Sequence, residues 1–163
     1  MGLLLACASC ASPDPKAELE IQGNETYWVV DAPVGRTQYL PPAVRFLVRN
    51  KGKRAWGNIE ATATFRRKGE EDKAWGSDYQ KVTSGGKELE KGESVLIVMR
   101  SDSRYFSDGP PETFFHHELF KDATVEIFLR IGSSNWTPFA KSPIDRRIGT
   151  RDLGAATAPQ PHP

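Results

Sequence analysis

Residues 59–66 read Ile-Glu-Ala-Thr-Ala-Thr-Phe-Arg, and this stretch indicates the fold class of the chain. Apolar side chains stand at every second position, with polar or charged side chains between them. Successive side chains of an extended chain point to opposite faces, so a period of two places all the apolar residues on one face. The stretch therefore predicts a β-strand with one face buried.

Comparable strand patterns recur along the chain, at 18–22, 27–30, 44–49, 95–99 and 125–131. In 95–99 every residue is apolar, so we expect that strand to be buried on both faces. Residues typical of turns separate the strands, at 50–53, 84–87, 91–93 and 108–111. No window of a dozen residues has helical spacing. The best candidate, 112–120, predicts one or two turns of helix, or a 3₁₀ turn, across the end of the fold.

Two further stretches carry a resemblance to a known architecture. Phe46-Leu47-Val48-Arg49-Asn50 precedes Lys51-Gly52, and Leu89-Glu90-Lys91-Gly92-Glu93-Ser94 precedes the strand at 95–99. These segments resemble a strand and a tight turn of the immunoglobulin-like sandwiches found in bacterial envelope proteins, over residues 17–149. The resemblance implies an all-β, antiparallel sandwich of about seven strands. No cysteine lies in this part of the chain, so its core must be held by packing alone.

The chain ends differ in composition from this central domain. Residues 1–16 predict a truncated signal segment followed by a tether, in which Pro13 and Pro15 are expected to keep the chain extended and to prevent a helix start. Residues 150–163 are rich in Ala, Thr and Pro and predict a flexible, disordered tail. We therefore expect three regions: 1–16, 17–149 and 150–163.

The segment Leu4-Leu5-Ala6-Cys7 lies in an uncharged stretch at the start of the chain. It resembles the lipobox of bacterial lipoproteins, which has leucine three residues before the cysteine and a small residue directly before it. The resemblance implies cleavage before Cys7, acylation of Cys7 and attachment to a membrane. Ala8 follows in place of aspartate, which favours the outer membrane in bacteria that have one.

Signal peptides also carry a positive n-region and an apolar stretch of about 7–15 residues. Met1 to Ala6 provides neither, and we expect the missing residues to lie upstream of Met1; the alternative is a chance match to the lipobox. A second alternative is a Cys-x-x-Cys redox or zinc motif formed by Cys7 and Cys10, the latter also being a weaker lipidation candidate. A redox pair requires a helix N-terminus, and a zinc site requires further ligands, neither of which the sequence indicates.

Composition and charge argue against several classes of protein. Lys plus Arg number 22 and Asp plus Glu number 21, giving a net charge of +1. This nearly equal number of positive and negative side chains argues against a nucleic-acid-binding protein. No Gly-x-Ser-x-Gly elbow or phosphate-binding loop is present, and the sequence suggests no catalytic residue and no cofactor.

Two groups of side chains are candidates for function. The first group is Trp56, Trp75 and Trp136, which could stack on a sugar or a partner. Trp56 and Trp75 lie among charged residues and glycines; alternatively, they cap the two ends of the core. The second group, His116-His117-Glu118, has poor spacing for one metal ion on either a strand or a helix, and we expect no metal site.

Three functions are consistent with these observations. The first is a non-catalytic cell-envelope lipoprotein that presents a β-sandwich to an envelope protein or glycan, with no nucleic-acid partner; it predicts an exposed apolar or aromatic patch. The second is a carbohydrate-binding module, which predicts that two of the three tryptophans are coplanar on one face. The third is a metal-dependent enzyme, which predicts a concave pocket where His116, His117 and Glu118 converge. We favour the first.

Overall fold

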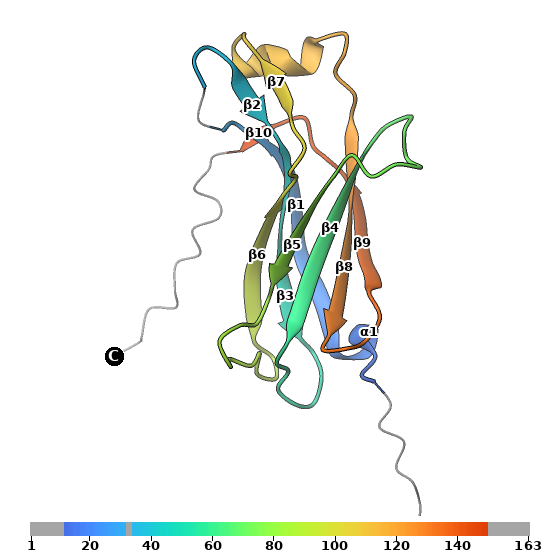
Figure 1. Cartoon of the computed structure of the whole chain (residues 1–163). Coiled ribbons are helices and arrows are strands. Elements are labelled where there is room, and N and C mark those ends of the chain that lie inside the picture. Colours follow the sequence, from blue (N-terminus) through green and yellow to red (C-terminus); the bar gives the residue numbers. More distant parts are fainter. Residues whose placement is uncertain (1–11, 32–33, 150–163) are drawn as a thin grey trace, which may run out of the picture.

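Two four-stranded sheets face each other in the computed structural model, which describes residues 12–31 and 34–149 (Figure 1). The first sheet has the order β10 (Ile148–Gly149), β1 (Leu19–Val29), β3 (Pro42–Asn50) and β6 (Ser94–Arg100). The second has the order β5 (Gly76–Lys81), β4 (Ile59–Arg67), β8 (Ala123–Ile131) and β9 (Thr137–Pro143). A two-stranded sheet, β2 (Gln38–Leu40) with β7 (Tyr105–Ser107), and two short helices, α1 (Pro15–Glu18) and η1 (Pro111–His116), complete the described fold.

The expected all-β sandwich is confirmed. Neighbouring strands are antiparallel throughout, except that β10 runs parallel to β1. The described residues form ten strands where about seven were expected, and three of the ten contain only two or three residues. The 3₁₀ helix η1 overlaps the segment 112–120, for which a helical turn was predicted.

The core lies between the two sheets and follows the predicted alternation. Along β4 and β8 the side chains are buried at every second position, and Phe65 and Ile127 are fully buried. From the first sheet, Phe46 and Ile97 are buried in the same cluster. Because burial of apolar area contributes about 25 cal/mol per Å², this inter-sheet layer supplies most of the stabilisation of a chain whose described part contains no cysteine.

The prediction that residues 95–99 are buried on both faces is wrong. β6 is the edge strand of its sheet, and Leu96 and Val98 are only half-buried on its outward side. The edge is capped by side chains from β5: Gln80 Nε2 donates to the Val98 carbonyl (2.6 Å), and the Arg100 amide donates to Asp78 Oδ2 (2.9 Å). Backbone groups of β6 are therefore satisfied from the neighbouring sheet.

The expectation that Pro13 and Pro15 prevent a helix start is also wrong. Pro15 is the first residue of α1, where the missing proline N–H costs nothing because the first amides of a helix have no partner within it. The Asp14 side chain accepts a hydrogen bond from the Lys16 amide (3.0 Å) and caps the helix. Helix α1 thus begins at Pro15, inside the segment 1–16 that was expected to end in an extended tether.

α1 and the β2–β7 sheet lie at opposite ends of the sandwich (Figure 1). β1 starts directly after α1 and runs along the length of the sandwich to the end where β2, β7 and η1 gather (Figure 1). The first helix, α1, therefore lies at one end of the sandwich, and the short β2–β7 sheet and η1 lie at the other end.

Candidate functional site

A pocket of about 880 Å³ opens at the β2–β7 end of the sandwich. Its walls come from β7, from η1 and the turn that follows it, and from the segment joining β4 to β5. Its large apolar side chains are Trp75, Tyr105, Phe106, Phe114, Leu119 and Phe120. Small-molecule sites in proteins are concave, mostly apolar and about 300–1,000 Å³ in volume, so this aromatic pocket has the size and lining of a binding site.

Local sequence explains how the aromatic side chains reach the pocket. Pro111 begins η1, and the Thr113 hydroxyl donates to the Pro110 carbonyl (2.8 Å), which tightens the first turn. The helix ends at His116, and the amide of the following residue, His117, donates to the Phe114 carbonyl (3.2 Å). This turn directs Phe114 into the core, where it is 4 % exposed.

Trp28, at the end of β1, forms the floor beneath the aromatic pocket. It is fully buried, and its ring centroid lies 5.3 Å from that of Phe114, 5.4 Å from that of Phe120 and 5.8 Å from that of Tyr105. Tilted and edge-to-face pairs at these distances stabilise beyond their burial, by about 0.5–1.5 kcal/mol each. The pocket therefore rests on a packed base of aromatic rings.

Two apolar side chains of the pocket face solvent. Phe106 is 73 % exposed and Leu119 is 72 % exposed, and they come from β7 and from the turn after η1. Single exposed apolar residues are ordinary, but these two both line one apolar pocket and add exposed apolar surface to it. An exposed apolar surface of this kind was expected for a module that binds a partner.

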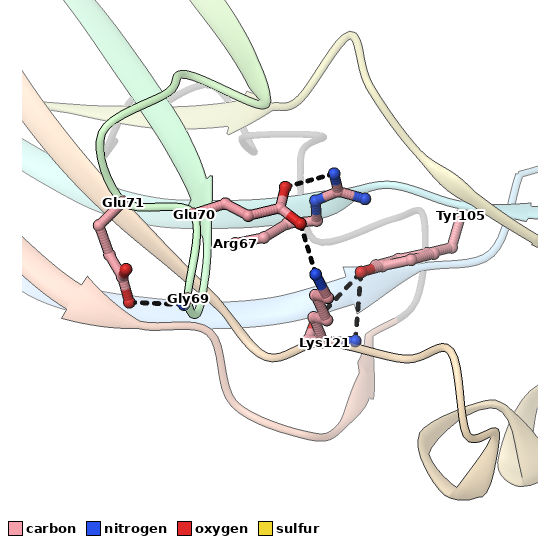
Figure 2. Close-up of polar contacts among 6 residues, drawn as sticks. All are labelled: Arg67, Gly69, Glu70, Glu71, Tyr105 and Lys121. Atoms are coloured by element: carbon pink, nitrogen blue, oxygen red, sulfur yellow. Dashed lines mark hydrogen bonds and ion pairs between the residues drawn. The ribbon is translucent and has the colours of Figure 1, made fainter.

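A polar network fixes one wall of the aromatic pocket (Figure 2). Glu70 accepts hydrogen bonds from Arg67 Nη2 (2.5 Å) and Lys121 Nζ, while the Tyr105 hydroxyl accepts from the Lys121 amide (3.2 Å). These bonds, the one from Lys121 first, hold the pKa of the Glu70 carboxyl below its usual value. The network ties the segment after β4 to the turn after η1, and so fixes the spacing of the two walls.

A further cationic side chain of the pocket lining is Arg104, directly before β7. Its guanidinium lies over the ring of Tyr39, 4.2 Å from the centroid, and its Nη1 is 3.7 Å from Asp31 Oδ2. Side chains that stack on an aromatic face keep their in-plane N–H groups available for hydrogen bonds. Arg104 is therefore held in place while half of its side chain remains exposed.

The three residues of the predicted histidine cluster do not converge. His117 lines the aromatic pocket and accepts a hydrogen bond at Nδ1 from the Leu119 amide (3.2 Å), whereas His116 and Glu118 are exposed and lie outside the pocket lining. Within residues 12–31 and 34–149, no group of three or more His, Cys, Asp or Glu side chains is placed to hold a metal ion.

The three candidate tryptophans lie apart. Trp56 is 9 % exposed at the α1 end, where its Nε1 donates to Glu18 Oε2 (2.9 Å) and Arg54 covers its ring at 3.9 Å. Trp75 lies at the other end, in the aromatic pocket, 6.3 Å from Trp28. In the described part of the chain, no two of the three candidates are in ring contact.

Trp136 belongs to a separate cluster on the second sheet. The Arg130 guanidinium lies 4.4 Å from its ring centroid, and the Tyr79 ring meets it edge-on at 85°. Hydrogen bonds from Arg130 and from the Tyr79 hydroxyl hold the pKa of the Glu60 carboxyl below its usual value. The hydrogen bond between Tyr79 and Glu60 also raises the pKa of Tyr79. A sugar-stacking platform needs coplanar rings, and this pair is nearly perpendicular.

Sequence reasoning missed most of the aromatic pocket. Phe106, Leu119, Arg104 and Lys121 were not singled out, although the aromatic stretch at 112–120 was expected at the end of the sandwich. Tyr105 and Phe106 follow an exposed polar loop, and nothing local shows that they meet Phe114. An excess of aromatic residues at 105–106 and 114–120, outside the regular strand patterns, was the available signal.

Cys7, the predicted lipidation site, and Cys10 lie outside the described residues. Within the described residues, none of the helices has the length and apolar character needed to cross a membrane.

Comparison with known proteins gives no family for the chain. No family model matches it, and no curated protein matches it. Among solved structures, the chain is similar to Northeast Structural Genomics Consortium target SoR45 (11% identity, TM-score 0.44, covering 91% of this chain and 99% of that one). It is also similar to part of Bacteroides uniformis β-glucuronidase 2 (17% identity, TM-score 0.43, covering 77% of this chain and 12% of that one). A third similar structure is the ApaA protein of Bordetella pertussis (14% identity, TM-score 0.41, covering 79% of this chain and 94% of that one). Similarity at this level does not transfer an activity between proteins.

Proposed function

We propose that the protein is a non-catalytic binding module of the cell envelope, and that the aromatic pocket is its binding site. The observation that carries this proposal is the pocket itself, an aromatic cavity of about 880 Å³ with Phe106 and Leu119 exposed beside it. Water leaves both the cavity and this patch when an apolar group enters, which favours binding.

Binding of N-phenyl-1-naphthylamine, an uncharged dye that fluoresces in apolar surroundings, tests this function. We expect the wild type to bind the dye and a Phe106→Ala/Leu119→Ala double variant to bind it about tenfold more weakly, because two apolar contacts are lost. The measurement is a fluorescence titration. Both side chains are mostly exposed, so the variant should fold normally.

Tyr79→Ala provides the matched control. Tyr79 is an exposed aromatic residue, but it lies in the cluster of Trp136 and not in the pocket lining. This variant should bind the dye as the wild type does. A wild type that does not bind the dye, or a double variant that binds it unchanged, would contradict the proposed site.

We further propose that the module is held at a membrane, the outer membrane where there is one, by an acylated Cys7. The arrangement of the sandwich supports this proposal: α1 lies at the end opposite the aromatic pocket (Figure 1). A tether leading into α1 would leave the pocket facing away from the lipid surface.

Intact mass and membrane partitioning, after expression in the native host with the upstream reading frame, test the anchor. The wild type should partition to the membrane with the added mass of an acylated cysteine, and Cys7→Ala should not. Cys10→Ala is the control, and it should remain acylated. A soluble, unmodified wild type, or loss of the lipid in Cys10→Ala alone, would refute acylation at Cys7.

A further inference from the structure

The charged side chains of the aromatic pocket are mostly cationic. Arg67, Arg104 and Lys121 line it, while Asp108 is the carboxylate in its lining. Asp108 is already engaged, because its Oδ1 accepts a hydrogen bond from the Thr37 hydroxyl (2.7 Å). Glu70 pairs with Arg67 and Lys121, and Asp31 pairs with Arg104, but both carboxylates lie outside the lining. The lining itself therefore carries more positive than negative groups, which favours an anionic ligand over a cationic one.

These cationic side chains differ in how many of their N–H groups already donate to a protein acceptor. Lys121 uses one of its three ammonium N–H groups for Glu70, and it remains half-exposed. Arg104 is paired with Asp31 only at 3.7 Å, beyond hydrogen-bonding distance, and within the described ranges no acceptor takes a hydrogen bond from its guanidinium. Its contact with the Tyr39 ring restrains the position of the guanidinium. A guanidinium so held is suited to receive a carboxylate with two parallel hydrogen bonds.

The size of the cavity restricts the partner further. A volume of about 880 Å³ is that of a site for a small molecule, and its aromatic walls are suited to hydrocarbon. From these observations, and on the basis of the proposed function above, we infer that the pocket binds a single-chain anionic amphiphile: its hydrocarbon lies among Phe114, Phe120 and Trp75, and Arg104, with Lys121, holds its carboxylate.

Displacement of N-phenyl-1-naphthylamine by three amphiphiles of equal chain length tests the inference. Dodecanoate, dodecan-1-ol and dodecyltrimethylammonium are compared at neutral pH, below their micellar concentrations. We expect dodecanoate to displace the dye at concentrations about tenfold lower than the alcohol, because a charge-assisted hydrogen bond forms only with the carboxylate. The ammonium should be the weakest competitor, and added salt should weaken dodecanoate alone.

Arg104→Gln should weaken dodecanoate about tenfold and leave dodecan-1-ol and the dye unchanged. Arg49→Gln is the matched control, since Arg49 is a similarly exposed arginine, paired with Glu20 (3.3 Å) on β3. If Arg104→Gln itself weakens dye binding, the inference is tested by the wild type alone, from the concentrations at which the three amphiphiles displace the dye. Equal displacement by all three amphiphiles, or full dodecanoate affinity in a folded Arg104→Gln variant, would overturn the inference while leaving the apolar pocket in place. If the dye does not bind the wild type, the proposed function fails instead.

Discussion

Replacing Asn50 by aspartate should lower the free energy of unfolding by about 3–5 kcal/mol. Asn50 is fully buried at the end of β3, where its Nδ2 donates to the carbonyls of Arg54 and Leu89, both at 2.8 Å. Its Oδ1 accepts from the Gly52 amide (2.9 Å). An ionised aspartate cannot donate, so both carbonyls would lose their partner and would face a buried charge.

Urea unfolding monitored by tryptophan fluorescence measures this change. Asn24→Asp is the control, because Asn24 is exposed and donates a single hydrogen bond, to the Ser142 hydroxyl (2.6 Å). That variant should lose less than about 1 kcal/mol. Equal destabilisation by the two substitutions would show that the hydrogen bonds of Asn50 to Arg54, Leu89 and Gly52 do not stabilise the fold.

Trp28→Ala should be comparably damaging, with a loss of about 3–5 kcal/mol. The substitution leaves a large cavity at the base of the aromatic pocket, and neighbouring rings such as Phe114 and Phe120 lose their contact with the indole. The pocket should therefore lose its binding of N-phenyl-1-naphthylamine together with its stability. Thermal unfolding and the dye titration measure the two effects.

Trp28→Phe separates packing from hydrogen bonding. The indole Nε1 is buried and has no hydrogen-bond partner among the described residues, so removing it costs no hydrogen bond there. We expect Trp28→Phe to lower the free energy of unfolding by roughly half as much as Trp28→Ala, or by less. A loss as large as that of Trp28→Ala would show that the indole N–H has a partner in solution.

The sequence pattern predicted those strands that have one apolar face and one polar face. β4 and β8 alternate apolar and polar residues, and this alternation follows directly from the burial of one face. β5 and β9 were missed because they lie at the edges of the second sheet, where few apolar residues are needed; Tyr79 is the one large apolar ring of β5. Pro138 and Pro143 also make β9 resemble a loop, although prolines are tolerated in edge strands.

The candidate site could not be derived in the same way. Arg67, Arg104 and Lys121 come from segments far apart in the chain, and only the packing of β7 and η1 against the sandwich brings them together. The continuous apolar run at 95–99 was misinterpreted for a related reason. Periodicity shows which residues could be buried, but it does not show what covers a strand's second face.

The capping of β6 has a consequence for how the molecule behaves at high concentration. A strand with five successive apolar residues at the edge of a sheet is a template for adding a strand from another chain, and so for aggregation. Gln80 and Asp78 occupy the Val98 carbonyl and the Arg100 amide, which are groups that an incoming strand would need. Two polar side chains of β5 thus obstruct the pairing of this edge with a strand from another chain.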